Sequence, residues 1–149
     1  GKKCGWLPLV SGIASGAECI LVPEYKTDIG ELIEVLKKRH AKGKTYSLIV
    51  VADGYGDTMQ IGKTIAEKTK LDTRISVLDL ILRGGSPTVI DRVKASQLGE
   101  KAALALLSGL YDIVFGYNKN DIVSIDLNDA VNNKKELDGE YVRIAKVLT

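Results

Sequence analysis

The stretch Ser47-Leu48-Ile49-Val50-Val51-Ala52 decides the fold class, because its apolar residues run on without alternating with polar ones. Such a run is typical of a strand that is covered on both faces, as the strands of parallel sheets are. Asp53 follows directly, at the expected carboxyl end of the strand. Ligands of open α/β sheets bind at that end, so Asp53 is a candidate site residue.

Helix and strand patterns alternate on both sides of this stretch. Apolar periodicity and turn residues predict helices over 6–16, 28–43, 61–70, 87–109 and 141–148, and strands over 19–22, 75–78, 113–115 and 122–125. Alternation of this kind predicts an α/β fold with a mostly parallel sheet sandwiched between helices in three αβα layers, and an antiparallel pair late in the chain. We expect residues 1–149 to form a single domain.

The amino-acid composition argues against several classes of protein function. The 149 residues carry 21 Lys and Arg against 19 Asp and Glu, a net charge of +2, which argues against a broad nucleic-acid-binding face. No apolar run approaches the roughly 20 residues that span a bilayer, so we expect no membrane partner. The two cysteines offer no disulfide scaffold, so we expect a reducing, cytoplasmic location. Two cysteines and one histidine cannot form a closed zinc site. The first residue is not Met, and we expect the chain to be part of a longer protein.

The segment Arg83-Gly84-Gly85-Ser86-Pro87 is the sharpest candidate for a ligand site. A guanidinium, two glycines and a helix start, with Ser86 as N-cap and Pro87 in the first turn, together offer several donors to an anion such as phosphate. The alternative is a tight strand-to-helix turn with a well-capped helix and a solvated arginine.

Other candidates have equally plain structural alternatives. Arg74 could pair with a phosphate or a neighbouring subunit, or form a surface ion pair. Asp53 could accept hydrogen bonds from sugar hydroxyls, or cap the glycine-rich turn that follows it. Lys42 and Lys44 could bind an anion, or complement the negative end of a helix dipole. The sequence has no Walker-type or GxSxG motif, so we do not expect this segment to catalyse a reaction alone.

These residues resemble those of a known family. The matching stretches are Gly1 to Leu7, Gly12 to Glu18, Val22-Pro23-Glu24, Asp72-Thr73-Arg74, Val77-Leu78, Arg83 to Pro87 and Asp91-Arg92. In this order they resemble the C-terminal half of 6-phosphofructokinase, across nearly the whole chain.

The resemblance implies the fructose 6-phosphate-binding half of a kinase that transfers the γ-phosphoryl group of ATP, with Mg²⁺, to the sugar in glycolysis. Whether the donor is ATP or pyrophosphate stays open, because the positions that discriminate between them would lie outside this chain. Positioning and electrostatics would supply most of the catalysis. In the residue-by-residue match, Gly1 and Lys2 meet the sugar and the transferred phosphate, and Asp53 contacts sugar hydroxyls. Arg83 binds the 6-phosphate, while Arg74 reaches into a neighbouring subunit of a homotetramer. The nucleotide-binding half and the catalytic aspartate would lie outside this chain.

The family also has an effector site for a nucleotide or phosphoenolpyruvate. Val22, Pro23 and Glu24 match its metal-contacting segment, which assigns an effector-bound Mg²⁺ to Glu24. Lys42 and Lys44 match its phosphate-binding lysines. Thr45 and Tyr46 stand where bacterial members often have basic residues, so the effector's identity stays open.

Three substrate positions depart from the family pattern. Lys2 replaces an arginine, Asp53 replaces a glutamate, and Leu80 stands where a phosphate-contacting histidine is expected. Leucine offers no hydrogen-bond donor, and lysine offers a point charge in place of a planar fork. The alternative function is therefore a non-catalytic, regulatory homologue that binds phosphorylated metabolites. A third reading, from the residues alone, is a small α/β anion-binding module.

Overall fold

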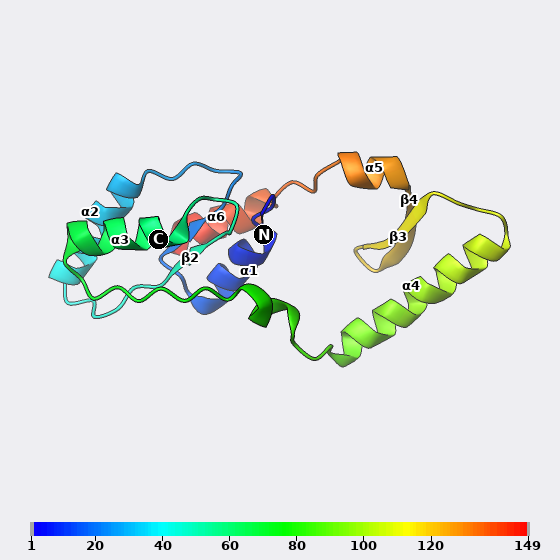
Figure 1. The fold of residues 1–149 in the computed structure, drawn as a ribbon, viewed down its shortest axis with the longest axis horizontal. Coiled ribbons are helices and arrows are strands. Elements are labelled where there is room, and N and C mark those ends of the chain that lie inside the picture. Colours follow the sequence, from blue (N-terminus) through cyan, green and yellow to red (C-terminus); the bar gives the residue numbers. More distant parts are fainter. Residues whose placement is uncertain (1, 149) are drawn as a thin grey trace. The chain divides into compact units, whose positions relative to one another are not determined.

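The computed structural model describes residues 2–148, without the side chains of Leu80, Arg83 and Leu148. The chain divides into two compact units (Figure 1). The first comprises Gly1–Val77 together with Leu137–Thr149, and the second is Leu78–Glu136. The second unit is thus an insertion in the first along the sequence. The expectation of a single domain stays a prediction.

The first unit contains a parallel strand pair and four helices. Its elements are α1 (Trp6–Ser15), β1 (Cys19–Leu21), α2 (Ile29–Ala41), β2 (Ile49–Val51), α3 (Thr58–Thr69) and α6 (Gly139–Leu148). β1 and β2 pair in parallel, with Cys19 opposite Ile49 and Leu21 opposite Val51. The crossover between them contains α2, which begins after Asp28, whose carboxylate accepts a hydrogen bond from the Gly30 N–H (2.7 Å). The parallel pairing predicted for the stretch around Val50 is confirmed for these two strands.

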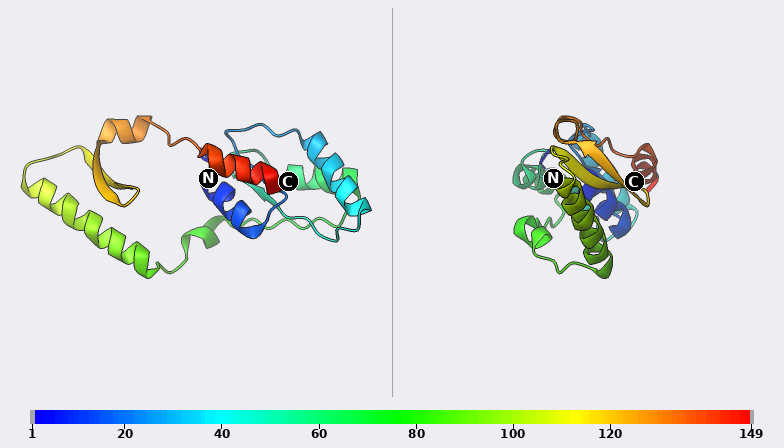
Figure 2. Two further views of the ribbon diagram at one scale, coloured as in Figure 1. Left: turned by 180° about the vertical axis from the view of Figure 1, so that it is seen from behind. Right: turned by 90° about the vertical axis from the view of Figure 1, so that its right-hand side faces the viewer.

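Two apolar clusters hold the first unit together. One is centred on Leu21 and Ile33, which are almost fully buried between the strands, α2 and α3. The other joins α1 to the C-terminal helix through Leu9, Val22 and Leu137. Figure 2 shows α6 beside α1, and the Trp6 and Tyr141 rings meet edge to face with centroids 5.9 Å apart. The two ends of the chain therefore share one core.

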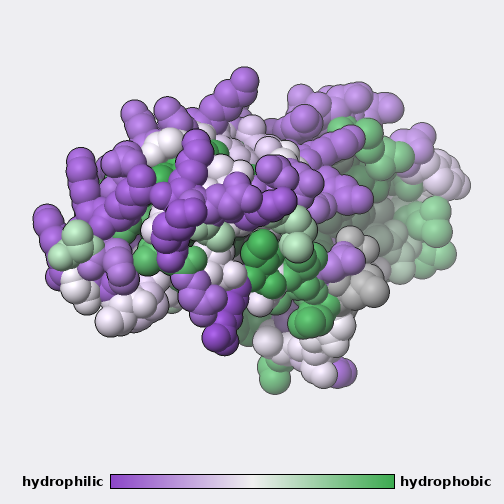
Figure 3. Space-filling view, turned by 60° about the vertical axis from the view of Figure 1, so that its left-hand side comes forward, coloured by the Kyte–Doolittle hydropathy of each residue, from purple (hydrophilic) through white to green (hydrophobic). Residues whose placement is uncertain are grey.

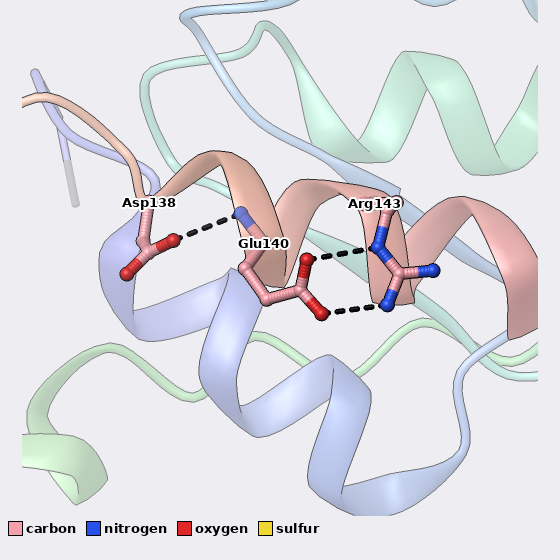
Figure 4. A network of polar contacts seen from close by, with 3 residues as sticks. All are labelled: Asp138, Glu140 and Arg143. Carbon is pink, nitrogen blue, oxygen red and sulfur yellow. Dashed lines mark hydrogen bonds and ion pairs between the residues drawn. The ribbon is translucent and has the colours of Figure 1, made fainter.

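Polar contacts fix the first turn of α6 (Figure 4). The Asp138 carboxylate accepts a hydrogen bond from the Glu140 N–H at 2.8 Å. Glu140 in turn accepts two hydrogen bonds from Arg143, at 2.8 and 2.6 Å. The Arg143 guanidinium holds the pKa of Glu140 below its ordinary value. This acid lies near the positive end of the helix dipole, where a negative charge is stabilising.

The second unit contains a long helix and an antiparallel hairpin. Its elements are the 3₁₀ helix η1 (Asp79–Arg83), α4 (Val89–Leu107), β3 (Ile113–Asn118), β4 (Asp121–Asp126) and α5 (Leu127–Asn132). In the hairpin Ile113 lies opposite Asp126 and Asn118 opposite Asp121, as expected for the antiparallel pair late in the chain. Tyr117 contacts the helix, where its hydroxyl donates to the Gln97 side-chain oxygen at 2.6 Å.

The predicted sheet is smaller than expected. Among the described residues, the strands form one two-stranded parallel sheet and one two-stranded antiparallel sheet, with no larger parallel sheet. The strand predicted over 75–78 is wrong, because these residues form no ladder hydrogen bonds in the described chain. The Ile75 side chain packs against Gly62 of α3 instead, so its apolar character reflects helix contact.

The start of α4 also differs from the prediction. The N-cap is Thr88, two residues after Ser86, and its hydroxyl accepts a hydrogen bond from the Asp91 N–H at 3.2 Å. The Asp91 carboxylate reaches back to the Thr88 N–H at 2.8 Å, which completes a capping box. Ser86 precedes Pro87, and the proline ring disfavours helical geometry for the residue before it.

The surface carries hydrophobic as well as charged side chains (Figure 3). No helix in the part of the chain that the structure describes is both long enough and apolar enough to cross a membrane.

Candidate functional site

Two of the predicted substrate-binding residues are brought together by a close backbone contact. The loop after β2 begins with Asp53 and Gly54, and the backbone of Lys2 lies directly against Gly54. A Cβ atom on Gly54 would lie only 1.9 Å from the Lys2 carbonyl oxygen, so this approach requires glycine. Lys2 and Asp53 are both exposed at this junction. Gly1, the third residue predicted here, lies outside the described residues.

Backbone hydrogen bonds shape the loop that carries Asp53. The Ala52 N–H donates to the Leu21 carbonyl at 2.8 Å, and the Tyr55 N–H donates to the Ala52 carbonyl at 2.9 Å. Asp57 caps α3 by accepting from the Met59 N–H at 2.9 Å. Within the described residues the Asp53 carboxylate takes no part in these bonds, so the turn is closed without it. The alternative in which Asp53 caps this turn is therefore wrong.

The other substrate-binding candidates lie further along the chain. Leu80 and Arg83 are on η1, and their side chains lie outside the described part of the structure. Gly84 ends η1 and donates to the Ile81 carbonyl at 3.4 Å. Arg74 forms an ion pair with Asp72 at 3.4 Å, and both side chains are more than four-fifths exposed. Such an exposed pair contributes about 0–1 kcal/mol to stability. Because its side chain is so exposed, the Arg74 guanidinium stays accessible.

Glu18 forms the most buried polar contact of the first unit. Glu18 lies directly before β1, and only 3% of its surface is exposed. One carboxylate oxygen pairs with the Lys44 ammonium, and the other accepts a hydrogen bond from the Leu48 N–H at 2.5 Å. The Glu18 N–H donates to the Leu48 carbonyl at 2.9 Å. Glu18 thereby tethers both ends of the segment between α2 and β2.

Burial and pairing act on the Glu18 carboxyl in opposite directions. Burial raises its pKa, but the hydrogen bond from Lys44, the Leu48 N–H and the positive charge of Lys44 outweigh burial. The pKa of Glu18 therefore lies below its ordinary value, and the carboxylate is ionised near neutral pH.

The predicted effector residues fall into two groups that do not meet. Val22, Pro23 and Glu24 follow β1, while Lys42 to Tyr46 precede β2. Because the strands are parallel, these groups lie at opposite ends of the pair. Glu24 accepts a hydrogen bond from the Gly5 N–H at 2.8 Å, which ties it to the start of α1.

The lysine group lies around the end of α2. Lys42 is the C-cap of that helix and is exposed, as the dipole argument expects. Thr45 and Tyr46 are exposed, and the Lys44 ammonium lies 5.8 Å from the Tyr46 ring centroid. The acid next to this group is Glu18, which was not among the predicted site residues. The sequence did offer one signal for Glu18, since it is an acid directly before an apolar strand. A charged acid that is buried at such a position requires a cationic partner.

The described residues offer little catalytic machinery of their own. They contain no group of three His, Cys, Asp or Glu residues placed to hold a metal ion. Burial raises the pKa of the Cys19 thiol to about 11, which keeps it protonated and unreactive.

Sequence comparisons agree with this picture. A family model described as phosphofructokinase matches residues 1–106. An ATP-dependent 6-phosphofructokinase from Halothermothrix orenii is 39% identical over 161 residues, which cover all of this chain and 48% of that protein. An enzyme of the same name from Bacillus licheniformis is 43% identical over 149 residues, covering 100% of this chain and 47% of the relative. The chain thus spans about half the length of the curated relatives that it matches.

Solved structures match over almost the whole chain. A crystal structure of phosphofructokinase from Pichia pastoris in the T-state aligns with a TM-score of 0.75 and 31% identity, covering 99% of this chain and 16% of that one. A pyrophosphate-dependent phosphofructokinase from Marinobacter aquaeolei aligns with a TM-score of 0.77 at 16% identity, covering 99% of this chain and 45% of that one, a likeness of fold alone. Because the family model matches more than half of the 149 residues, this chain belongs to the phosphofructokinase family.

Proposed function

We propose that this chain is the fructose 6-phosphate-binding part of an ATP-dependent 6-phosphofructokinase, which phosphorylates fructose 6-phosphate to fructose 1,6-bisphosphate in glycolysis. The observation that carries the proposal is identity of about 40% along the entire chain to relatives named as that enzyme. The contact of Lys2 with the Asp53 loop supports it, because it gathers two expected sugar-binding residues at the end of a parallel strand.

The binding roles follow from side-chain chemistry. Lys2 supplies a positive charge toward the transferred phosphate, and the Asp53 carboxylate accepts hydrogen bonds from sugar hydroxyls. Arg83 binds the 6-phosphate through the planar fork of its guanidinium. The exposed Arg74 is suited to a phosphate of a neighbouring subunit in a homotetramer. Residues Gly1 and Leu80 complete the proposed site, although leucine there contributes no hydrogen bond.

The donor phosphates and their metal belong to the part of the enzyme outside this chain. Mg²⁺ is usually held by one or two carboxylates together with substrate phosphates. Among the described residues no group of three His, Cys, Asp or Glu side chains is placed to hold a metal ion, so the substrate phosphates would supply part of its ligands. When bound with ATP, Mg²⁺ neutralises charge on the donor phosphates.

An effector phosphate would bind at the lysine group. Lys42 is exposed, and Lys44 is held at the start of the same segment by Glu18. We assign the acid of this site to Glu18 in place of Glu24, because Glu24 lies at the other end of the strand pair. An effector-borne Mg²⁺ would therefore have Glu18 as its nearest carboxylate. A nucleotide or phosphoenolpyruvate carries the phosphate that this site requires.

A second candidate function is a regulatory homologue without turnover. Leu80 favours it, because a leucine cannot replace a phosphate-binding donor, and each lost bond to a charged group costs about 1.5–3 kcal/mol. Lys2 and Asp53 stand in place of the expected arginine and glutamate, and these changes weaken substrate binding further.

The two functions are separated by measuring binding and turnover in the full-length protein. Fructose 6-phosphate is titrated calorimetrically, and turnover is assayed with ATP and with pyrophosphate. Arg83→Ala is compared with Arg92→Ala, a matched change at an exposed arginine in the first turns of α4.

The proposal predicts that turnover requires ATP and that Arg83→Ala weakens sugar-phosphate binding while Arg92→Ala does not. Binding without turnover on either donor would support the regulatory homologue. Absence of both in folded protein would overturn the sugar-phosphate site itself.

A further inference from the structure

The chain contains two Asp-Gly pairs, Asp53-Gly54 and Asp138-Gly139. In such a pair the aspartate side chain can react with the backbone that follows it. The glycine amide nitrogen attacks the side-chain Cγ of the aspartate, because glycine carries no side chain to hinder the attack and its backbone is conformationally free. The two pairs differ in how firmly the structure holds them.

Asp138 is held at the start of α6. Its carboxylate accepts a hydrogen bond from the Glu140 N–H at 2.8 Å (Figure 4), and its carbonyl accepts one from the Val142 N–H at 3.1 Å. Gly139 is the first residue of the helix. Before the Asp138 carboxyl can reach the Gly139 nitrogen, it must release the Glu140 N–H, and the first turn must open. Both requirements slow the reaction at this pair.

Asp53 and Gly54 are not held in this way. Both residues lie in the turn after β2, and both are exposed. The hydrogen bond that closes this turn joins the Tyr55 N–H to the Ala52 carbonyl. Among the residues that the structure describes, neither the Asp53 carboxylate nor the Gly54 N–H takes part in a hydrogen bond. No such bond therefore has to break before the nitrogen meets Cγ.

The fold requires the glycine of this pair. A Cβ atom at Gly54 would lie 1.9 Å from the Lys2 carbonyl oxygen, so a larger residue fits only if Lys2 moves. At position 53 the family pattern has glutamate, whose longer side chain would have to close a six-membered ring, which forms more slowly. In this chain aspartate at position 53 instead precedes a glycine that the fold cannot replace.

We propose that Asp53 is a site of spontaneous isoaspartate formation. A bond forms between the Gly54 nitrogen and Asp53 Cγ, while the nitrogen's proton and a carboxyl oxygen leave as water, which gives a five-membered succinimide ring. Water then opens the ring at either carbonyl, which restores aspartate or yields isoaspartate. The water released is balanced by the water consumed, so the reaction needs no other reactant and leaves the mass unchanged.

The effect on the substrate site rests on the proposed function. In isoaspartate the backbone runs through the former side-chain carbon, so it gains one methylene group before Gly54 and the free carboxylate becomes shorter by the same group. The longer backbone displaces Gly54 from Lys2, and the shorter carboxylate is withdrawn from the sugar hydroxyls. Bound fructose 6-phosphate engages the Asp53 carboxylate and should therefore slow the reaction.

Ageing of the full-length protein in water labelled with heavy oxygen tests the proposal. Each ring opening adds one heavy oxygen to the pair, and peptide mass spectrometry with electron-transfer fragmentation separates isoaspartate from aspartate. Isoaspartate should form roughly tenfold faster at Asp53 than at Asp138, because ring closure at Asp138 must first break a hydrogen bond to a charged group. Formation at Asp53 that is no faster than at Asp138 overturns the proposal.

Asp53→Glu is the matched variant, and the Asp138 pair is its internal control. This variant should take up no heavy oxygen at position 53, while labelling at Asp138 stays as in the wild type. Uptake at position 53 that equals the wild type overturns the proposal, because the label would then enter by another route.

Ageing with fructose 6-phosphate, followed by turnover assays, separates this proposal from the proposed function. Slower isoaspartate formation in the presence of the sugar phosphate, with turnover that falls as isoaspartate accumulates, supports both. Isoaspartate at Asp53 that leaves turnover unchanged supports the modification and overturns the sugar-binding role of Asp53. Full turnover in aged protein that has no isoaspartate at Asp53 overturns only the modification.

Discussion

The contact between Lys2 and Gly54 yields the sharpest prediction, because one methyl group tests it. In Gly54→Ala the new Cβ would lie 1.9 Å from the Lys2 carbonyl oxygen and 2.5 Å from its carbon, where ordinary contact begins at 3.4 Å. The two backbones must separate by about 1.5 Å, the difference between these distances. Forced separations of this kind cost about 1–3 kcal/mol of stability, so the protein should still fold.

The larger effect is expected on substrate. Moving Lys2 away from Asp53 breaks the arrangement proposed to bind the sugar, and a displacement of about 1 Å in a positioned site can cost 10²-fold in rate. We expect kcat/KM for fructose 6-phosphate in the full-length enzyme to fall on the order of a hundredfold, with urea unfolding measured alongside.

Gly56→Ala is the matched control in the same loop, since its new methyl group would meet only Ile61 Cδ1, at 3.9 Å. It should leave kcat/KM within about twofold, as expected for a site that can accept alanine. If Gly54→Ala behaves like Gly56→Ala, the Lys2 backbone does not depend on this approach and the proposed sugar site is wrong.

Three further predictions concern stability. Ile33→Ala should lower the free energy of unfolding by about 2–5 kcal/mol, while Val35→Ala, at a 39% exposed position of the same helix, should cost less than about 1 kcal/mol in urea titrations. Similar losses for both would contradict the assigned core. The lowered pKa of Glu18 predicts stabilisation that is complete above its ordinary value of 4.5 and is lost as the pH falls below this value, through the folded-state pKa. Unfolding in urea at several pH values checks it, and Glu18→Gln should flatten the slope below pH 4.5. Thr88→Ala should weaken the start of α4 by about 1 kcal/mol, seen as faster amide exchange in its first turn; unchanged exchange would mean that the capping box does not form.

Local patterns were sufficient for much of the fold. The unbroken apolar stretch around Val50 predicted a parallel strand, and Asp28 predicted the start of α2, because each depends on neighbours within a few residues. The predictions for residues 75–78 and for Ser86 were wrong for the same reason. Apolar residues at 75–78 fit a strand as well as helix contact, and the capping box of Thr88 and Asp91 competes with Ser86 for the same helix start.

Part of the candidate site could likewise be predicted from local sequence, and part could not. Residue type and order alone predicted the family and named Lys2, Asp53 and Lys44, because these chemistries can be read one position at a time. The position of Glu18 before an apolar strand indicated a buried acid, but it did not indicate which residues Glu18 contacts. Its role depends on Leu48 and Lys44, which are about thirty residues away and meet it only when β1 and β2 pair.

The sequence by itself determined the family, the parallel pairing of its first two strands and the positions of most helices, because hydrophobic periodicity and capping are local properties. Only the tertiary structure decided that Lys2 packs on Gly54, that a buried carboxylate holds Lys44, and that Glu24 lies at the far end of the strands from the lysines. These are contacts between distant segments, set by how the backbones approach one another when water is excluded from the core. No pattern along the chain records that approach.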